Sequence, residues 1–322
     1  TLSLHDALPI YPSANQAAGY KIYWDNSVLN WSTLRYRIGN NSNNQNHTPT
    51  LVPGTDNFYV VTTPAYNDME AWHFANNPGW ADSHTIYRTA TNNESGQPEI
   101  AITASTTFQQ YKVTEDITVI PTITHSTGTD NTGDKVNNQC EFYTIITPTS
   151  GMLTHTATIT PPSHGTINIA YTDVNSAAQN KTATTAGLAH RTILTVTATP
   201  ATGYKATAFT VTPSGEAASN LTSGATDNHI LAKDATFAAT FAAKQAAITF
   251  DKNSGTSGDN GTTATYGTAM TTITAPTRDG YTFGGYYDAE TSNNGSGTQY
   301  YNANGTSART WDKDTEAATT LY

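Results

Sequence analysis

The sequence has little of what several protein classes require. Its 322 residues include one cysteine, Cys140, which excludes an internal disulfide framework and paired-cysteine metal sites. Only 15 lysines and arginines stand against 25 acidic residues, for a formal charge of −10, and no basic cluster is available for nucleic-acid phosphates or an anionic membrane. No run approaches the roughly 20 apolar residues of a membrane helix. We therefore expect no nucleic-acid partner and no membrane span.

Sequence signatures of catalysis are also missing. GxSxG, HExxH, Walker and dinucleotide-binding motifs do not occur. Asp25 and Asp56 flank predicted strands, where acidic residues commonly serve turns and caps. His73 and His84 have no second histidine pair or cysteines at zinc-ligand spacing. We therefore expect no catalytic residue, no metal site and no cofactor.

Strand signals recur along the chain. Charged residues make up 12% of the composition, and the abundance of threonine, asparagine, glycine and tyrosine favours strands and turns over helices. Apolar and polar residues alternate in several segments, as on a strand with one buried face. The apolar positions are Tyr20, Ile22 and Trp24; Leu34, Tyr36 and Ile38; Leu194, Val196 and Ala198; and Ala235, Phe237, Ala239 and Phe241. We predict an all-β protein.

Composition divides the chain into three units. An N-terminal unit, 15–121, carries strand and turn signals typical of an antiparallel β-sandwich. Residues 124–139 contain one aliphatic residue among polar and turn-forming ones, so we predict a linker over 122–150. A middle unit, 151–245, and a C-terminal unit, 246–322, follow. Residues 1–14 are a lead-in, of which 1–10 resemble a translated sequencing adapter and are excluded from the fold prediction.

The C-terminal unit carries a recognisable motif. Ile248, Thr249, Phe250, Asp251 and Asn253 form its opening, and the later part consists of Pro276, Thr277, Arg278, Gly280, Tyr281, Phe283 and the pair Tyr286-Tyr287. This pattern resembles the Listeria–Bacteroides repeat, a β-grasp-like relative of the internalin B-repeat. In that family the sequence continues past the equivalent of Leu321-Tyr322. The resemblance implies that the last strand is cut short and that the chain is a fragment.

The middle unit contains a related motif. Ala198, Pro200, Gly203 and Tyr204 follow the Ala-x-Pro-x-x-Gly-Tyr pattern of the internalin B-repeat, and the unit resembles a divergent member of that family. Two small β-grasp-like modules in tandem are how repeat stalks are built. The resemblance implies a secreted or cell-surface bacterial protein whose stalk serves adhesion or display, with a host or neighbouring-cell surface protein as a candidate partner.

The N-terminal unit holds four of the five tryptophans. The order of Asn26, Trp31, Pro53-Gly54, Phe74, Asn76-Asn77 and Gly79 resembles a starch-binding type of carbohydrate-binding module. Tyr23, Trp31 and Trp80 are the candidate platform on which a sugar ring would stack. The alternative is that the aromatic residues of this unit fill a sandwich core. A polysaccharide is therefore a second candidate partner, and the chain would then be a glucan-binding accessory, such as that of a polysaccharide-degrading enzyme.

Overall fold

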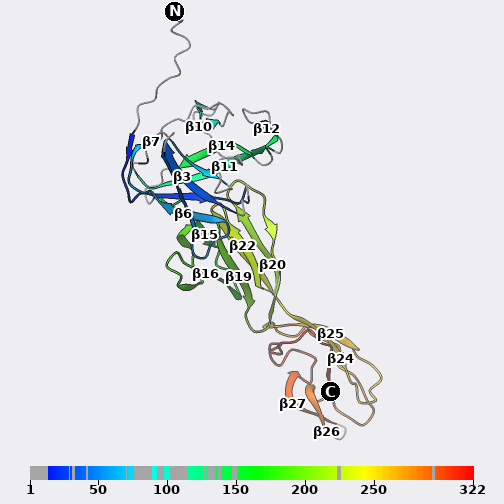
Figure 1. Ribbon diagram of the computed structural model, residues 1–322. Coiled ribbons are helices and arrows are strands. Elements are labelled where there is room, and N and C mark those ends of the chain that lie inside the picture. The colour runs from blue at the N-terminus through cyan, green and yellow to red at the C-terminus, as the bar shows by residue number, and fades with distance from the viewer. Residues whose placement is uncertain are drawn as a thin grey trace, which may run out of the picture.

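The computed structural model describes 14–28, 30, 33–40, 43–69, 71–75, 89–92, 98–101, 113, 115–125, 128–129, 135–136, 139–146, 151–222, 226–291 and 294–322. Its regular elements are all strands, so the all-β prediction is confirmed. Within these ranges no helix is long and apolar enough to cross a membrane. Three groups of strands follow one another from the N-terminal to the C-terminal end (Figure 1).

A seven-stranded sheet forms the larger layer of the N-terminal unit. Its order is β5 (Thr50–Leu51), β6 (Phe58–Thr62), β2 (Lys21–Asp25), β11 (Ile117–His125), β14 (Gln139–Ile146), β10 (Pro98–Ala101) and β9 (Thr89–Asn92). β2 and β11 run parallel, so the sheet is mixed and not antiparallel as expected. β14 pairs with β11 and β10, which corrects the prediction of a linker over 122–150. In the sequence, a further antiparallel strand pair, β12 (Gly128–Thr129) and β13 (Lys135–Val136), lies between β11 and β14.

A smaller sheet completes the N-terminal unit. It consists of β4 (Asn43–His47), β3 (Arg35–Asn40) and β8 (Ala71–Ala75), while β1 (Ala14–Gln16) pairs with β7 (Tyr66–Met69). Side chains of both sheets meet in one apolar cluster, in which Trp24 stacks on Phe74 with ring centroids 4.4 Å apart. Tyr36 and Ile38 of β3 are buried there, as their alternation predicts. Burying each such side chain contributes about 1.5–3 kcal/mol.

The middle unit is built from two sheets around one core. The five-stranded sheet has the order β18 (Thr185–Ala189), β15 (Thr154–Ile159), β23 (Ala235–Ala243), β20 (Tyr204–Pro213) and β21 (Ser219–Asn220). The four-stranded sheet has the order β17 (Ala178–Lys181), β16 (Gly165–Thr172), β19 (Thr192–Pro200) and β22 (Thr226–Leu231). Leu194 and Val196 of β19 meet Phe237 of β23 in the core. The arrangement of two stacked sheets differs from the β-grasp-like module implied by the resemblance.

The C-terminal unit has less strand and more loop. β24 (Gln245–Phe250) lies between β25 (Gly261–Thr265) and the parallel β28 (Thr319–Leu321), and β26 (Tyr286–Thr291) forms a hairpin with β27 (Asn294–Tyr301). The backbones of Tyr287 and Tyr322 exchange two hydrogen bonds of 2.8 and 2.9 Å, which join the hairpin to the end of β28. Large aromatic side chains dominate the core, namely Phe250, Tyr286, Tyr300, Tyr301 and Trp311.

Candidate functional site: two joints and a tyrosine-lined pocket

The predicted sugar platform is only partly described. Trp31 and Trp80 lie outside the described residues. Tyr23 is 8% exposed, and its ring stacks on Phe58 at 5.7 Å. Its pKa is raised by this burial and by the nearby Asp116. Tyr23 is therefore withdrawn from the predicted platform, because its ring is covered by protein.

The middle unit completes the cover over Tyr23. Tyr23, Val52 and Phe58 of the N-terminal unit form an apolar cluster with Ala189 at the end of β18, and Met152 packs against the same cluster. β2 is consequently buried on both faces, one against the N-terminal core and the other against the next unit. We call this contact the N-terminal joint, comprising residues 52–58, Tyr23, Asp25 and the segments 151–155 and 189–193.

A chain of polar side chains crosses the N-terminal joint. Asp25 Oδ2 lies 2.9 Å from His190 Nε2, and His190 Nδ1 lies 2.8 Å from His155 Nε2. His155 Nδ1 lies 3.6 Å from Asp234 Oδ1 at the exposed end of the chain. Asp25 and His190 are almost fully buried, so the N–H of His190 that points at the carboxylate is a strong, charge-assisted donor.

Burial and hydrogen bonding act on this chain in opposite directions. Burial by itself would raise the pKa of Asp25, but hydrogen bonds from His190 and Ser27 outweigh it and hold the pKa below its ordinary value. The pKa of His155 is lowered, first by burial and then by the neighbouring His190, with Asp234 opposing the change. The chain is therefore most stable with Asp25 ionised and His155 neutral.

Arg191 connects the two backbones at the same joint. Its Nε donates to the carbonyl of Asp56 at 2.7 Å, and its guanidinium forms an ion pair with the Asp56 carboxylate. The backbone pairs as well: Asp56 N donates to Arg191 O, and Ile193 N donates to Gly54 O, both at 2.9 Å. The loop after β5 thus adds a short antiparallel bridge to β19.

Gly54 is required by this pairing. Its φ of +73° lies in the left-handed region, and a Cβ at this position would stand 1.9 Å from the backbone oxygen of Thr172. On the other side of the joint, the buried hydroxyl of Thr118 donates to Gly151 O and accepts from Leu153 N. The start of the middle unit is therefore fixed to β11.

We call the contact between the middle and C-terminal units the C-terminal joint. It involves fewer residues than the N-terminal joint. Lys244 is the single residue between β23 and β24. Its N–H donates to Gly203 O at 2.8 Å, and its carbonyl accepts from Tyr266 N at 2.9 Å. The Tyr266 ring meets Tyr204 edge to face at 5.9 Å, and it approaches Gly203 so closely that a Cβ there would lie 2.1 Å from it.

Two ion pairs bridge the C-terminal joint. Lys205 Nζ lies 2.5 Å from Glu316 Oε1, and Lys244 Nζ lies 2.7 Å from Asp314 Oδ1. The carboxylates of both pairs are largely exposed to solvent, so each pair is screened by water and salt. In this joint, orientation depends on the short linker and the tyrosine contact more than on charge.

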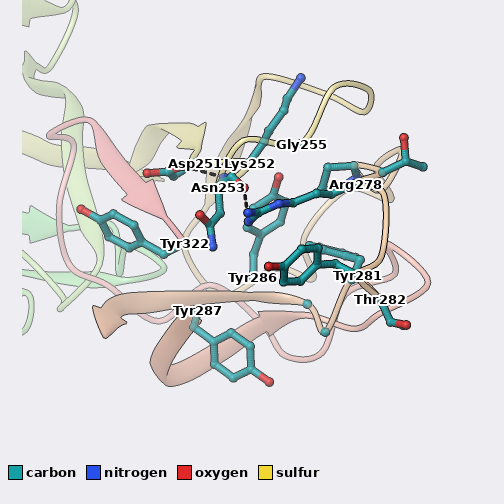
Figure 2. A pocket seen from close by; sticks show the side chains of 15 residues that line it. Asp251, Lys252, Asn253, Gly255, Arg278, Tyr281, Thr282, Tyr286, Tyr287 and Tyr322 are labelled. Atoms are coloured by element: carbon teal, nitrogen blue, oxygen red, sulfur yellow. Dashed lines mark hydrogen bonds between the residues drawn. The ribbon is translucent and has the colours of Figure 1, made fainter. Parts of the chain in front are cut away.

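A pocket of about 280 Å³ opens on the C-terminal unit. Its walls come from the loop after β24, from the 276–285 segment, from the start of β26 and from Tyr322. Asn253 lies between Tyr322 on one side and the Arg278 and Tyr281 side chains on the other (Figure 2). Tyr281 is 67% exposed, and the guanidinium of Arg278 lies 4.1 Å from its ring centroid.

The cations of the pocket are held by backbone oxygens. Arg278 donates to Asn253 O at 2.9 Å, and Lys252 donates to Gly258 O at 2.8 Å. The buried Tyr286 hydroxyl has no hydrogen-bond partner among the described residues. Burial, aided by Asp251 and Asp259, raises the pKa of Tyr286 to about 12, so this hydroxyl keeps its proton at neutral pH.

The sequence did not predict several residues of the N-terminal joint. His155, His190 and Arg191 were not singled out, and Asp25 and Asp56 were predicted only as turn or cap residues. A signal exists at 190–191, where two ionisable residues interrupt the apolar positions before β19. In the parts of the chain with assigned positions, no group of three or more histidine, cysteine or acidic side chains could hold a metal ion.

Comparison with known proteins adds little. No protein-family model matches the sequence, and no curated protein matches it. Among solved structures, the major pilin protein T-13 of Streptococcus pyogenes aligns with 71% of this chain and 98% of its own, at 8% identity and a TM-score of 0.24. A likeness at this TM-score does not establish a shared fold.

Proposed function

We propose that this chain is a non-catalytic segment of a secreted or cell-surface bacterial protein, and that its units form a stalk for adhesion or display. The observation that carries the proposal is the N-terminal joint, where an apolar cluster, a buried polar chain and paired backbones connect two units. Domains in one chain move relative to each other by default unless their interface is extensive and apolar. A joint of this kind transmits orientation, which a stalk requires.

The second joint supports the same function. A one-residue connection between β23 and β24 leaves little conformational freedom between the middle and C-terminal units. The resemblance of the C-terminal unit to the Listeria–Bacteroides repeat supports placement on a bacterial surface. The proposed partners are a host or neighbouring-cell surface protein, or a polysaccharide.

The stalk proposal is tested by a display experiment. The chain is inserted between a bacterial surface anchor and an epitope tag, and binding of antibody-coated beads to the epitope is compared with that of an equally long Gly-Ser sequence. We expect the chain to hold the epitope farther from the surface and to bind more beads, because a flexible chain coils back. Equal bead binding by both displays would argue against a stalk.

Sugar binding by the N-terminal unit is the alternative function. It rests on the order of aromatic and turn residues that resembles a starch-binding module, and after the correction of Tyr23 its proposed site consists of Trp31 and Trp80. Affinity electrophoresis through starch and other glucans tests it. Retardation that is lost in Trp31→Ala and Trp80→Ala proteins would support a glucan-binding accessory, whereas unchanged mobility in every glucan would leave the stalk as the function.

A further inference from the structure

We propose that the tyrosine-lined pocket of the C-terminal unit binds a single ring of a neutral sugar. This site is separate from the predicted platform of the N-terminal unit and goes beyond a stalk function. Four observations carry the proposal: the size of the pocket, the exposed ring of Tyr281, the way in which the pocket's cations are already bound, and the buried hydroxyl of Tyr286.

The size of the pocket limits its ligand. Pockets that enclose drug-sized molecules usually measure about 300–1,000 Å³. A volume of about 280 Å³ lies just below that range and suits one sugar ring with its hydroxyls. Extended polymers would project from it, and only one residue of the polymer would enter.

Tyr281 provides a stacking surface beside this volume. One face of its ring lies against the Arg278 guanidinium, so most of its 67% exposure belongs to the other face and the edge. Such a ring offers an apolar surface to the C–H face of a pyranose, and the guanidinium contact restricts its rotamers before the ligand arrives. Figure 2 shows Tyr281 and Arg278 on the same side of Asn253.

The electrostatics of the pocket favour a neutral ligand. Lys252 and Arg278 are both bound to backbone oxygens, so an anion would have to compete for them. Asp251 accepts the N–H of Asn253 with Oδ1 at 2.8 Å, and a carboxylate with about four lone-pair sites keeps further capacity for ligand hydroxyls. An exposed carboxylate on the wall also repels phosphate and carboxylate groups.

Tyr286 supplies a second argument for a hydroxylated ligand. Its ring lines the pocket, and its buried hydroxyl has no partner among the residues with assigned positions. An enclosed polar group without a partner carries a desolvation cost that no hydrogen bond offsets. After a small shift of the ring, a sugar hydroxyl in the pocket would offset that cost.

A proline-rich peptide is the main rival ligand, since such peptides also dock on aromatic side chains. They lie along grooves lined by several exposed aromatic rings. In this pocket Tyr281 is widely exposed, while Tyr286 is buried, and Figure 2 shows the Tyr287 and Tyr322 rings apart from the Tyr281 ring. The arrangement is a single platform and fits one ring better than an extended peptide.

The test uses the full chain carrying Trp31→Ala and Trp80→Ala, so that the predicted N-terminal platform does not contribute. Calorimetric titration with maltohexaose, cellohexaose and chitohexaose is compared with titration with a polyproline peptide. We expect at least one sugar to bind, and Tyr281→Ala to weaken it about three- to tenfold, the range that loss of an aromatic contact produces. Tyr281→Phe should retain most of the affinity.

Two further variants separate binding from folding. Tyr286→Phe should leave the melting temperature unchanged or raised, because it removes an unpartnered hydroxyl, and should still weaken sugar binding. Ile230→Ala, at an exposed apolar side chain of the middle unit, should change neither quantity. The proposal is overturned if none of the three sugars binds, if Tyr281→Ala binds as well as its parent, or if only the polyproline peptide binds.

Discussion

The two joints of the middle unit hold their neighbours by different physical means. At the N-terminal joint a carboxylate, two imidazoles and an apolar cluster are withdrawn from water, and the loop around Gly54 pairs with β19. At the C-terminal joint one residue connects two strands, two tyrosines touch, and the bridging carboxylates face solvent. Both arrangements restrict orientation, but they depend on different conditions.

The contrast shows that burial decides whether pH or salt concentration affects the stability of a contact. Buried hydrogen bonds are little affected by salt but depend on the protonation of their partners, whereas exposed ion pairs are screened by salt. We therefore expect the N-terminal joint to respond to pH and to truncation of its polar groups. The C-terminal joint should respond to salt, and only weakly.

The largest expected difference comes from removing one acidic partner at each joint. Asp25→Ala leaves His190 buried without its acceptor, so the free energy of opening the N-terminal joint should fall by about 3–5 kcal/mol. Glu316→Ala removes an exposed pair with Lys205 and should cost only about 0.2–1 kcal/mol. Native-state hydrogen exchange over 189–193 and 203–205 reports each opening. Similar costs at the two joints would remove the distinction between them.

Glycine replacement should produce a smaller difference. At Gly54 an alanine meets the backbone of Thr172, whereas at Gly203 it meets the Tyr266 side chain, which has more freedom to move. Both positions have positive φ, so each substitution adds about 1–3 kcal/mol of backbone strain. Gly54→Ala should therefore destabilise its joint more than Gly203→Ala, as measured by urea unfolding. A larger loss for Gly203→Ala would mean that Tyr266 is held more firmly than the contact suggests.

Above pH 3.8 the pH response of the two joints should be confined to the N-terminal joint, because Asp314 at the C-terminal joint, whose pKa is lowered by its hydrogen bond with Lys244, stays ionised there. His155 has a pKa below its ordinary 6.5 in the folded protein, so the unfolded chain binds more protons once the pH falls below that value. Stability is then complete above pH 6.5 and falls as the pH drops through the folded pKa, by at most about 1.4 kcal/mol per pH unit. The lowered pKa of Asp25 adds a second loss below pH 3.8.

The geometry of the joint also predicts that its stability falls as the pH drops. His155 faces His190 and Asp234, while His190 faces Asp25, beside which Arg191 lies. Only one hydrogen atom fits between His155 Nε2 and His190 Nδ1. When both imidazoles are charged, both nitrogens carry a hydrogen, so this contact is lost. His155→Gln should flatten the response below pH 6.5 in hydrogen exchange over 189–193. His229→Gln is the control, because His229 has a lowered pKa from burial but lies outside the joint. If exchange over 189–193 still depends steeply on pH in His155→Gln, a group other than His155 causes the response.

Salt should have the smallest effect. Raising the ionic strength from about 0.01 to 1 M shortens the screening length from about 30 to 3 Å. The pairs Lys205–Glu316 and Lys244–Asp314 should weaken slightly, and exchange over 203–205 should rise while exchange over 189–193 stays constant. A salt response at the N-terminal joint would show that its polar chain is more open to solvent than its burial indicates.

Local patterns in the sequence predicted the elements well but not the contacts between units. Leu194, Val196 and Ala198 are buried as their alternation predicts, because a strand has a fixed period of two. Tyr23 was assigned to a surface that the middle unit covers, and Asp25 has a partner 165 residues later in the chain. No local pattern specifies such a pairing.

Two other features also arise only when distant segments of the chain pack together, so local sequence patterns did not predict them. The polar run up to residue 139 suggested a linker, yet the apolar and aromatic residues of β14 pair with β11 and complete the sheet. For the pocket, the resemblance singled out residues from Pro276 to Phe283, but not their role as a wall. That wall faces Asp251 and Tyr322, which only the parallel pairing of β24 and β28 brings near.

A stalk requires that the three units hold fixed orientations, and distance measurement by pulsed electron paramagnetic resonance tests this requirement most directly. Spin labels are attached at Thr62→Cys and Thr272→Cys in a Cys140→Ser chain, so that the measured distance spans both joints. We predict one narrow distance distribution at neutral pH, which broadens when Asp25→Ala is added. A broad distribution in the parent protein would contradict a stalk and show that the units move independently.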